Sequence, residues 1–220
     1  MNKALARDTI RNVFSNEFDK TNFTNFTNTL LHSAHFDSYT IQGNQIPDQY
    51  KDHIESLERL ATFSDSNGKA IDLLIVTLLK DTALDRARTM QRNFVARYLD
   101  TERKDAALVA FVCSGLPYWR FSLIKMELSF VGINVKLNFT PAKRWSFLVG
   151  KNEGSHTAQS QLLDILANDN EDPTLDELIE AFSIETVTKE FYQKYRELFD
   201  RMTEDLEKLI EEDQDIKFDF

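Results

Sequence analysis

The sequence has few of the residues that mark specialised structural classes. Its 220 residues include one cysteine, Cys113, which excludes an internal disulfide framework and makes a reducing cytoplasm the expected compartment. Six glycines and four prolines exclude collagen-like and low-complexity chains. No run approaches the ~18 apolar residues of a membrane span, and the N-terminus lacks the apolar core of a secretory signal. We therefore expect no membrane partner.

Charge is distributed unevenly along the chain. Hydrophobic residues make up 42% of the sequence, enough to bury a sizeable core, and the net charge is −10. Residues 161–220 hold 19 Asp/Glu against 6 Lys/Arg, whereas residues 80–151 hold 13 Lys/Arg against 6 Asp/Glu. A basic middle beside an acidic end is typical of a nucleic-acid surface with an acidic neighbour. An ordinary solvated surface followed by an acidic helix accounts for the same distribution.

Hydrophobic periodicity predicts a mixed α+β fold. Asn67-Gly68 between two apolar runs predicts a β-hairpin formed by Ser56–Phe63 and Ala70–Leu79. Helices are expected over residues 2–18, 21–29 and 81–102, the last with a long apolar stripe, and further strands over 106–113, 120–131, 133–139 and 145–149. This order predicts a mixed central sheet with a β-hairpin and one long helix packed across it.

Strand signals end near Ser155, and only helical patterns follow. Helices are predicted over Thr157–Leu166, after Pro173, and from about Glu185 to Glu212. We therefore predict two domains: an α/β module over residues 1–155 and an acidic helical extension over residues 156–220.

Asp72, at the start of the second hairpin strand, is the main candidate for metal chemistry. In many DNA-cleaving folds a strand-borne Asp and a following (D/E)xK hold Mg²⁺, while the lysine polarises the attacking water. The strand after Asp72 has no second carboxylate, but Lys80 shares its face by the period of two, and Glu127 on another predicted strand could complete the site. The nearby sequence Glu102-Arg103-Lys104 is expected to be a solvated helix end.

The predicted catalytic residues are therefore Asp72, Glu127 and Lys80, with Asp72 and Glu127 as ligands of a possible Mg²⁺. The alternative is a degraded site or a purely structural hairpin.

Basic side chains are the candidate DNA contacts, because guanidinium groups bind phosphates in a bidentate manner. Six are predicted: Arg86, Arg88, Arg92 and Arg97 on the long central helix, and Lys143 and Arg144 beside Trp145. The alternative is that the helix arginines pair with acidic residues of the same helix or of the C-terminal helices.

Six ordered segments carry a resemblance to a known family. They are residues 85–99 (DRARTMQRNFVARYL), 105–111 (DAALVAF), 119–127 (WRFSLIKME), 140–144 (TPAKR), 156–159 (HTAQ) and 181–192 (AFSIETVTKEFY). In this order they resemble the N-terminal region of bacterial type IIG-like restriction–modification enzymes, in which a module precedes an adenine-specific DNA methyltransferase. The resemblance implies a PD-(D/E)xK nuclease-like core, double-stranded DNA as a partner, and a methyltransferase domain in the same polypeptide.

The sequence leaves two functions open. One is a Mg²⁺-dependent endonuclease domain of a type II restriction–modification enzyme, and the other is a catalytically inactive module for DNA binding or interdomain docking. The chain itself has neither the asparagine-proline-proline-aromatic motif nor the glycine-rich cofactor loop of the methyltransferases, so we do not expect it to methylate DNA. The last residues, 216–220 (IKFDF), place apolar side chains directly after a predicted acidic helix, from which we expect a fragment of a longer protein.

Overall fold

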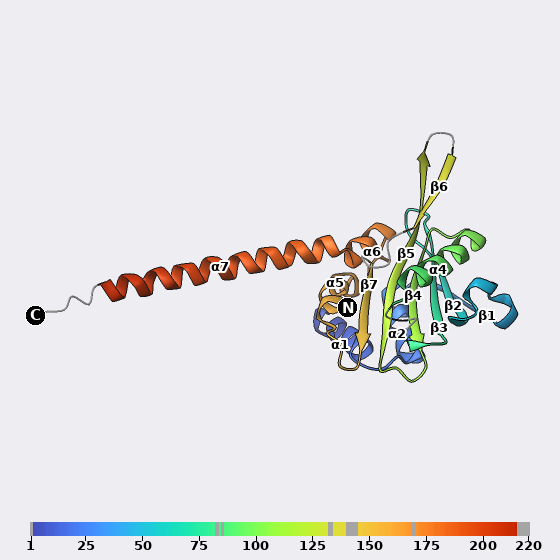
Figure 1. Cartoon of the computed structure of the whole chain (residues 1–220), viewed down its shortest axis with the longest axis horizontal. Coiled ribbons are helices and arrows are strands. Elements are labelled where there is room, and N and C mark those ends of the chain that lie inside the picture. The colour runs from blue at the N-terminus through green and yellow to red at the C-terminus, as the bar shows by residue number, and fades with distance from the viewer. Residues whose placement is uncertain are drawn as a thin grey trace, which may run out of the picture. The chain divides into compact units, whose positions relative to one another are not determined.

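The protein is described by a computed structural model that covers residues 2–81, 84, 86–131, 134–139, 145–168 and 170–214. Its strands are β1 (His35–Gln42), β2 (Ile54–Ser64), β3 (Ala70–Leu78), β4 (Ala106–Cys113), β5 (Tyr118–Val131), β6 (Asn134–Phe139) and β7 (Ser146–Gly150). Its helices are α1 (Lys3–Phe14), α2 (Lys20–Leu30), α4 (Arg88–Glu102), α5 (His156–Ala167), α6 (Leu175–Phe182) and α7 (Ile184–Gln214), with short 3-10 turns η1 (Gly43–Gln45) and η2 (Asp48–Tyr50) (Figure 1). The chain divides into two compact units, Met1–Ser183 and Ile184–Phe220.

The first unit is built on one mixed sheet with the strand order β1-β2-β3-β4-β5-β6. The first three strands pair antiparallel, β3 and β4 pair parallel through the α4 crossover, and β5 returns antiparallel to β4. The first part of β5 also pairs with β7, and its last residues pair with β6. The predicted α+β fold, with its mixed sheet, hairpin and long helix, is confirmed.

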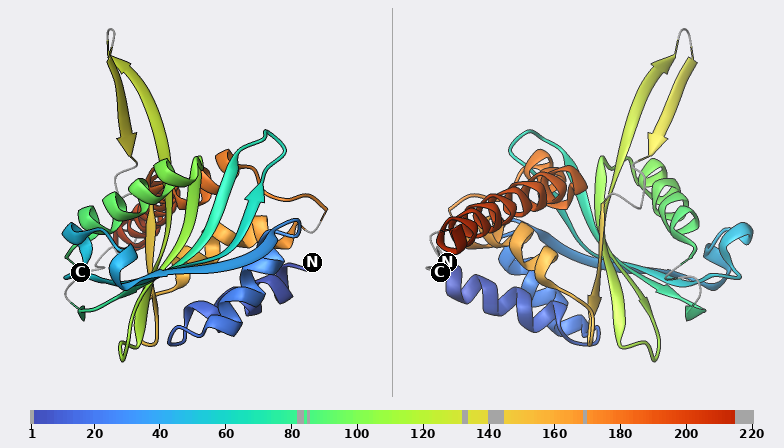
Figure 2. Two further views of the ribbon diagram at one scale, coloured as in Figure 1. Left: turned by 90° about the vertical axis from the view of Figure 1, so that its right-hand side faces the viewer. Right: turned by 60° about the vertical axis from the view of Figure 1, so that its left-hand side comes forward.

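The two faces of the sheet are covered by different helices. On β3, Ile71, Leu73 and Ile75 belong to a core shared with α1, α2, α5 and α6, whereas Leu74 and Val76 belong to a core shared with α4. Figure 2 shows α4, in green, on one side of the sheet and α1 and α2, in blue, on the other. Because side chains alternate along a strand, Asp72 points toward the α4 face.

Aromatic side chains fasten the N-terminal helices to the sheet. Asn2 caps α1 by accepting a hydrogen bond from the Ala4 N–H, and Phe14 at the end of that helix packs against Phe121 of β5 with ring centroids 5.6 Å apart. Phe23 of α2 meets Trp119 edge-on at 5.6 Å. Both predicted N-terminal helices are confirmed, and both bury their apolar stripe on this sheet face.

The predicted hairpin is formed by β2 and β3, and its turn also holds α6 in place. Gly68 has φ +74°, a left-handed conformation that favours glycine. The Asp65 carboxylate accepts hydrogen bonds from the Asn67 N–H at 2.9 Å, the Lys69 N–H at 2.8 Å and the Leu175 N–H at 2.9 Å. Burial acts to raise the pKa of the Asp65 carboxyl, but these three N–H donors outweigh it and lower the pKa.

The structure places the division of the chain later than the sequence does. Leu162 and Leu166 of α5 and Leu178 and Phe182 of α6 are at most 1% exposed, in the same core as α1 and α2. Helices predicted to belong to an extension from residue 156 therefore lie within the first unit, which ends at Ser183. The end of the strand signals near Ser155 does not mark the domain boundary, because helices that follow the last strand can still cover the sheet.

Candidate functional site

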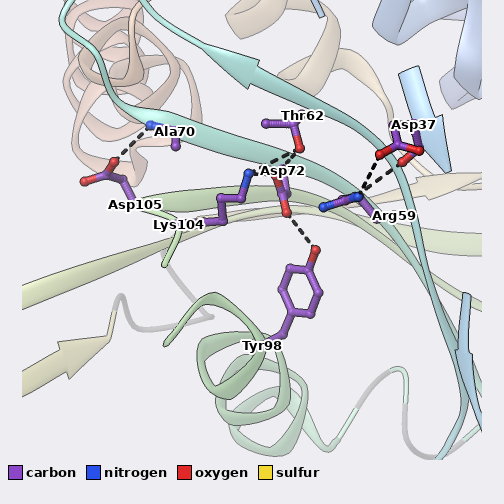
Figure 3. A network of polar contacts seen from close by, with 8 residues as sticks. All are labelled: Asp37, Arg59, Thr62, Ala70, Asp72, Tyr98, Lys104 and Asp105. Atoms are coloured by element: carbon purple, nitrogen blue, oxygen red, sulfur yellow. Dashed lines mark hydrogen bonds and ion pairs between the residues drawn. The ribbon is translucent and has the colours of Figure 1, made fainter. Parts of the chain in front are cut away.

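Asp72 lies at the centre of a buried polar cluster between the sheet and α4. Its side chain is fully buried. The Tyr98 hydroxyl of α4 donates to Asp72 Oδ2 at 2.7 Å, and the Thr62 hydroxyl of β2 donates to Oδ1 at 2.8 Å. Lys104 Nζ lies 3.1 Å from Oδ1 and completes an ion pair (Figure 3). Both carboxylate oxygens are therefore satisfied by protein donors.

Lys104 reaches this cluster because of the way α4 ends. Arg103 adopts φ 55° and ψ 49°, a left-handed conformation, and the Lys104 N–H donates to the Leu99 carbonyl at 3.0 Å. The chain turns back, and the Lys104 side chain is only 16% exposed. The expectation that Glu102-Arg103-Lys104 is a solvated helix end is thus wrong for Lys104.

The pKa of the Tyr98 hydroxyl is raised in this cluster. Burial raises the pKa of the Tyr98 hydroxyl, and its hydrogen bond to the Asp72 carboxylate raises that pKa further. Tyr98 therefore remains a neutral donor to Asp72 at physiological pH. The apolar stripe of the long helix was predicted from the sequence, but the pairing of Tyr98 with Asp72 was not.

The structure does not bring Lys80 to Asp72. Asp72 lies near the start of β3 and Lys80 follows its end, so the eight residue steps that separate them span about 25 Å along an extended strand. Lys80 is exposed, and the lysine beside Asp72 is Lys104 instead. A shared face along one strand does not imply proximity when the separation is this long.

The backbone of Glu127 lies two strands away from Asp72. Asp72 is in register with Ala107 of β4, which pairs with Ile124 of β5, and Glu127 is three residues further along β5, where its partner is Asn138 of β6. The structure describes the backbone of Glu127 but not its side chain.

The cluster around Asp72 does not fit a magnesium site as it stands. Mg²⁺ binds carboxylate oxygens and water with little steric tolerance, whereas here both oxygens of a fully buried carboxylate already face a hydroxyl or an ammonium group. In the described part of the chain, no group of three or more His, Cys, Asp or Glu side chains is placed to hold a metal ion. The negative charge of the buried Asp72 carboxylate is instead compensated by Lys104 and by two hydroxyl donors.

Two of the predicted DNA-contacting arginines lie side by side on α4. Arg88 and Arg92 are one helical turn apart and half-buried, and Arg92 donates to the Asn93 side-chain oxygen at 3.2 Å. The Arg88 Nε is buried and hydrogen-bonds to no described residue. Neither arginine forms an ion pair within the ranges that the structure describes.

The other predicted contacts are not part of this pair. Arg86 is exposed just before α4. Arg97 is exposed about 140° further around the helix than Arg92 and borders a cavity of about 250 Å³ beside Gln45 and Pro47. Lys143 and Arg144 lie outside the described residues. Of the four predicted contacts that the structure describes, Arg97 lies on a different side of α4 from the pair, and Arg88 and Arg92 are the two that the structure brings together.

No family model matches the chain, and a search of the curated proteins finds no match to it. Among the described helices, none combines the length and apolar character that crossing a membrane requires.

Proposed function

We propose that this chain is a nuclease-like module of a restriction–modification polypeptide that binds double-stranded DNA without cleaving it. The observation that carries the proposal is the pair Arg88 and Arg92, two adjacent guanidinium groups on α4 with no carboxylate partner among the described residues. The resemblance of the six sequence segments supports the restriction–modification context and a methyltransferase as the neighbouring domain.

The surroundings of Asp72 support the absence of cleavage. A catalytic carboxylate must reach a metal ion or a substrate, but Asp72 is fully buried and holds Tyr98, Thr62 and Lys104 together. In this proposal the parallel β3–α4–β4 unit, which would carry the chemistry in a nuclease, serves as a rigid support for the helix that carries the arginines.

The chemistry of the pair suits a phosphate backbone. A guanidinium without a carboxylate partner offers several donors in a planar fork, which matches the oxygens of a phosphate. Contacts of this kind position a protein on DNA and do not read its sequence. We therefore expect the pair to contribute to general DNA affinity.

The proposal is tested by salt-dependent binding of the full chain to a fluorescent DNA duplex of ~30 base pairs. Each phosphate contact contributes about 0.9 to the slope of log K against log salt, so Arg88→Ala with Arg92→Ala should lower the slope by about 2 and weaken binding at every salt concentration. The matched control is Arg7→Ala with Arg11→Ala, an exposed pair with the same spacing on α1, which covers the opposite sheet face. That variant should keep the wild-type slope.

Three results would contradict the proposal: no binding, binding that is independent of salt, or an equal loss in both variants. Cleavage is tested separately with supercoiled plasmid and Mg²⁺ or Mn²⁺. We expect the plasmid to stay intact. Nicking by the wild type that Asp72→Asn abolishes would establish the endonuclease alternative instead.

A further inference from the structure

A cavity of about 250 Å³ lies between α4 and the first two strands of the sheet. Ile41 of β1 and Leu57 of β2, which are paired in register, line it from the sheet, and Phe94 and Tyr98 line it from α4. Gln45, at the end of η1, closes it from the turn that follows β1. All the residues that line the cavity belong to the first unit, so one compact body builds the whole site.

The inner part of the cavity is apolar. Leu57, Phe94 and Tyr98 are at most 6% exposed, and Tyr98 brings no charge because its neutral hydroxyl donates to Asp72. Water gains little from such walls, so an apolar group that replaces it is stabilised. At ~30 Å³ per water molecule the volume corresponds to about eight waters, which is the scale of a small metabolite and below that of most drug-sized ligands.

Two opposite charges lie at the rim of the cavity, and both come from α4. Arg97 and Glu102 are about 140° apart around the helix, with Phe94 and Tyr98 between them. Neither forms an ion pair with a described residue. Among the described residues that line the cavity, no other carries a charge. The rim is therefore neutral as a whole, with a positive edge and a negative edge on either side of an apolar wall.

Two uncharged groups at the rim have hydrogen-bonding capacity left for a ligand. Gln45 Oε1 accepts the Gln42 N–H at 3.3 Å, which leaves the side-chain NH₂ of Gln45 as a donor. The Thr101 hydroxyl donates to the Arg97 carbonyl at 3.0 Å, which leaves the lone pairs of its oxygen as acceptors. The rim thus offers both donors and acceptors beside its two charges.

We propose that this cavity binds a free α-amino acid with an apolar side chain. The side chain lies against Leu57 and Phe94, the carboxylate meets Arg97 and the ammonium group meets Glu102. Arg97 and Glu102 are ~7.5 Å apart along the helix axis, a separation that their long side chains can span to reach one head group. A fatty acid or an amine leaves one rim charge without a partner, and an amino acid inside a peptide lacks both charges, so the rim disfavours these competitors.

The proposal is tested by ligand-observed NMR titration of the full chain, in the absence of DNA, with leucine and three analogues that each lack one part of it. Isocaproate lacks the ammonium group, isoamylamine lacks the carboxylate, and glycine lacks the side chain. We expect saturable binding of leucine at millimolar concentration or below. Each analogue should bind at least about tenfold more weakly, because it loses a charge-assisted hydrogen bond or the burial of apolar surface.

Variants of the cavity locate the binding. Arg97→Gln should reduce the affinity for leucine to that for isoamylamine, and Glu102→Gln should reduce it to that for isocaproate. Ile41→Phe fills the cavity and should abolish leucine binding while circular dichroism shows that the fold is retained. The matched control is Asp100→Asn, which removes an exposed carboxylate of α4 that does not line the cavity, and it should keep the wild-type affinity.

Three results would overturn the proposal: no saturable binding of leucine, equal affinity for leucine and its analogues, or an unchanged affinity for leucine in both charge variants. None of them bears on the DNA-binding proposal, because Arg88 and Arg92 do not line the cavity and DNA is absent from the measurement.

Discussion

At the scale of single residues, Asp72 shows how a buried carboxylate can be structural. Removing a charge from water is costly unless hydrogen bonds and an opposite charge compensate it. Asp72 has both, from Tyr98, Thr62 and Lys104. The cluster links β2 and β3 to Tyr98 of α4 and to Lys104 just after that helix, so its main effect is to fix the position of α4 on the sheet.

Tyr98→Phe tests this role. The variant loses a hydrogen bond to a charged group and leaves Asp72 Oδ2 without that donor, so we expect the free energy of unfolding at pH 7 to fall by about 2 kcal/mol. Urea unfolding measures it. Tyr50→Phe is the matched control: Tyr50 is 7% exposed in the same core, and its hydroxyl bonds to no described residue. That variant should lose less than about 0.5 kcal/mol.

The difference in the free energy of unfolding between the wild type and Tyr98→Phe should depend on pH, and the raised pKa of Tyr98 fixes the direction. Because the pKa of Tyr98 is raised in the folded protein, its stabilisation is complete below the unfolded pKa of ~10 and declines as the pH rises above it. The advantage of the wild type over Tyr98→Phe should then shrink by about 1.4 kcal/mol per pH unit above pH 10. An advantage that stays constant to pH 11 would show that Tyr98 ionises normally.

The sequence located part of this site but not its partners. Asp72 stands out because a carboxylate in an apolar strand is rare, and that signal is local. Lys104 is 32 residues away, and it reaches Asp72 only because Arg103 turns the chain back at the end of α4. No spacing rule connects a strand residue with a residue beyond a crossover helix. Lys80 was predicted instead because it shares the strand face of Asp72 by the period of two.

At the scale of elements, local signals predicted those segments that carry strong patterns. Asn67-Gly68 identified the β2–β3 hairpin, and the continuous apolar run of β4 was predicted at its observed bounds, Ala106–Cys113. The edge strand β1 was missed because none of its residues is fully buried and its side chains alternate in burial only over its last four residues. The helix α4 begins at Arg88 and not at Asp81, and no side chain caps its first turn.

The end of α4 yields a prediction at this scale. Arg103 is held at φ 55°, a conformation that strains residues with a Cβ atom, and glycine is free of that strain. We expect Arg103→Gly to raise the free energy of unfolding by about 0.5–1 kcal/mol in chemical denaturation. Asn152, at φ 70°, is the comparison, because asparagine tolerates this region and Asn152→Gly should gain less. A loss of stability in Arg103→Gly would mean that the arginine side chain itself supports the turn.

At the scale of the whole chain, α5 and α6 belong to the body of the protein. They help to cover the sheet face that α1 and α2 also cover. Asp65, in the turn between β2 and β3, binds the Leu175 N–H at the start of α6 across more than a hundred residues of sequence. A linker toward another domain would not be held in this way. The unit that folds cooperatively should therefore extend to Ser183.

Truncation distinguishes this division from the one at residue 155. Five side chains of α5 and α6 are at most 2% exposed: Leu162, Leu166, Leu175, Leu178 and Phe182. Each contributes about 1.5–3 kcal/mol by burial, so removing all five takes away an amount comparable with the ~5–15 kcal/mol that stabilises a typical domain. We expect residues 1–183 to unfold cooperatively with a midpoint close to that of the full chain, and residues 1–155 to show no cooperative transition and to bind a hydrophobic dye. Cooperative unfolding of residues 1–155 at the full-chain midpoint would restore the earlier boundary and make α5 and α6 an appended layer.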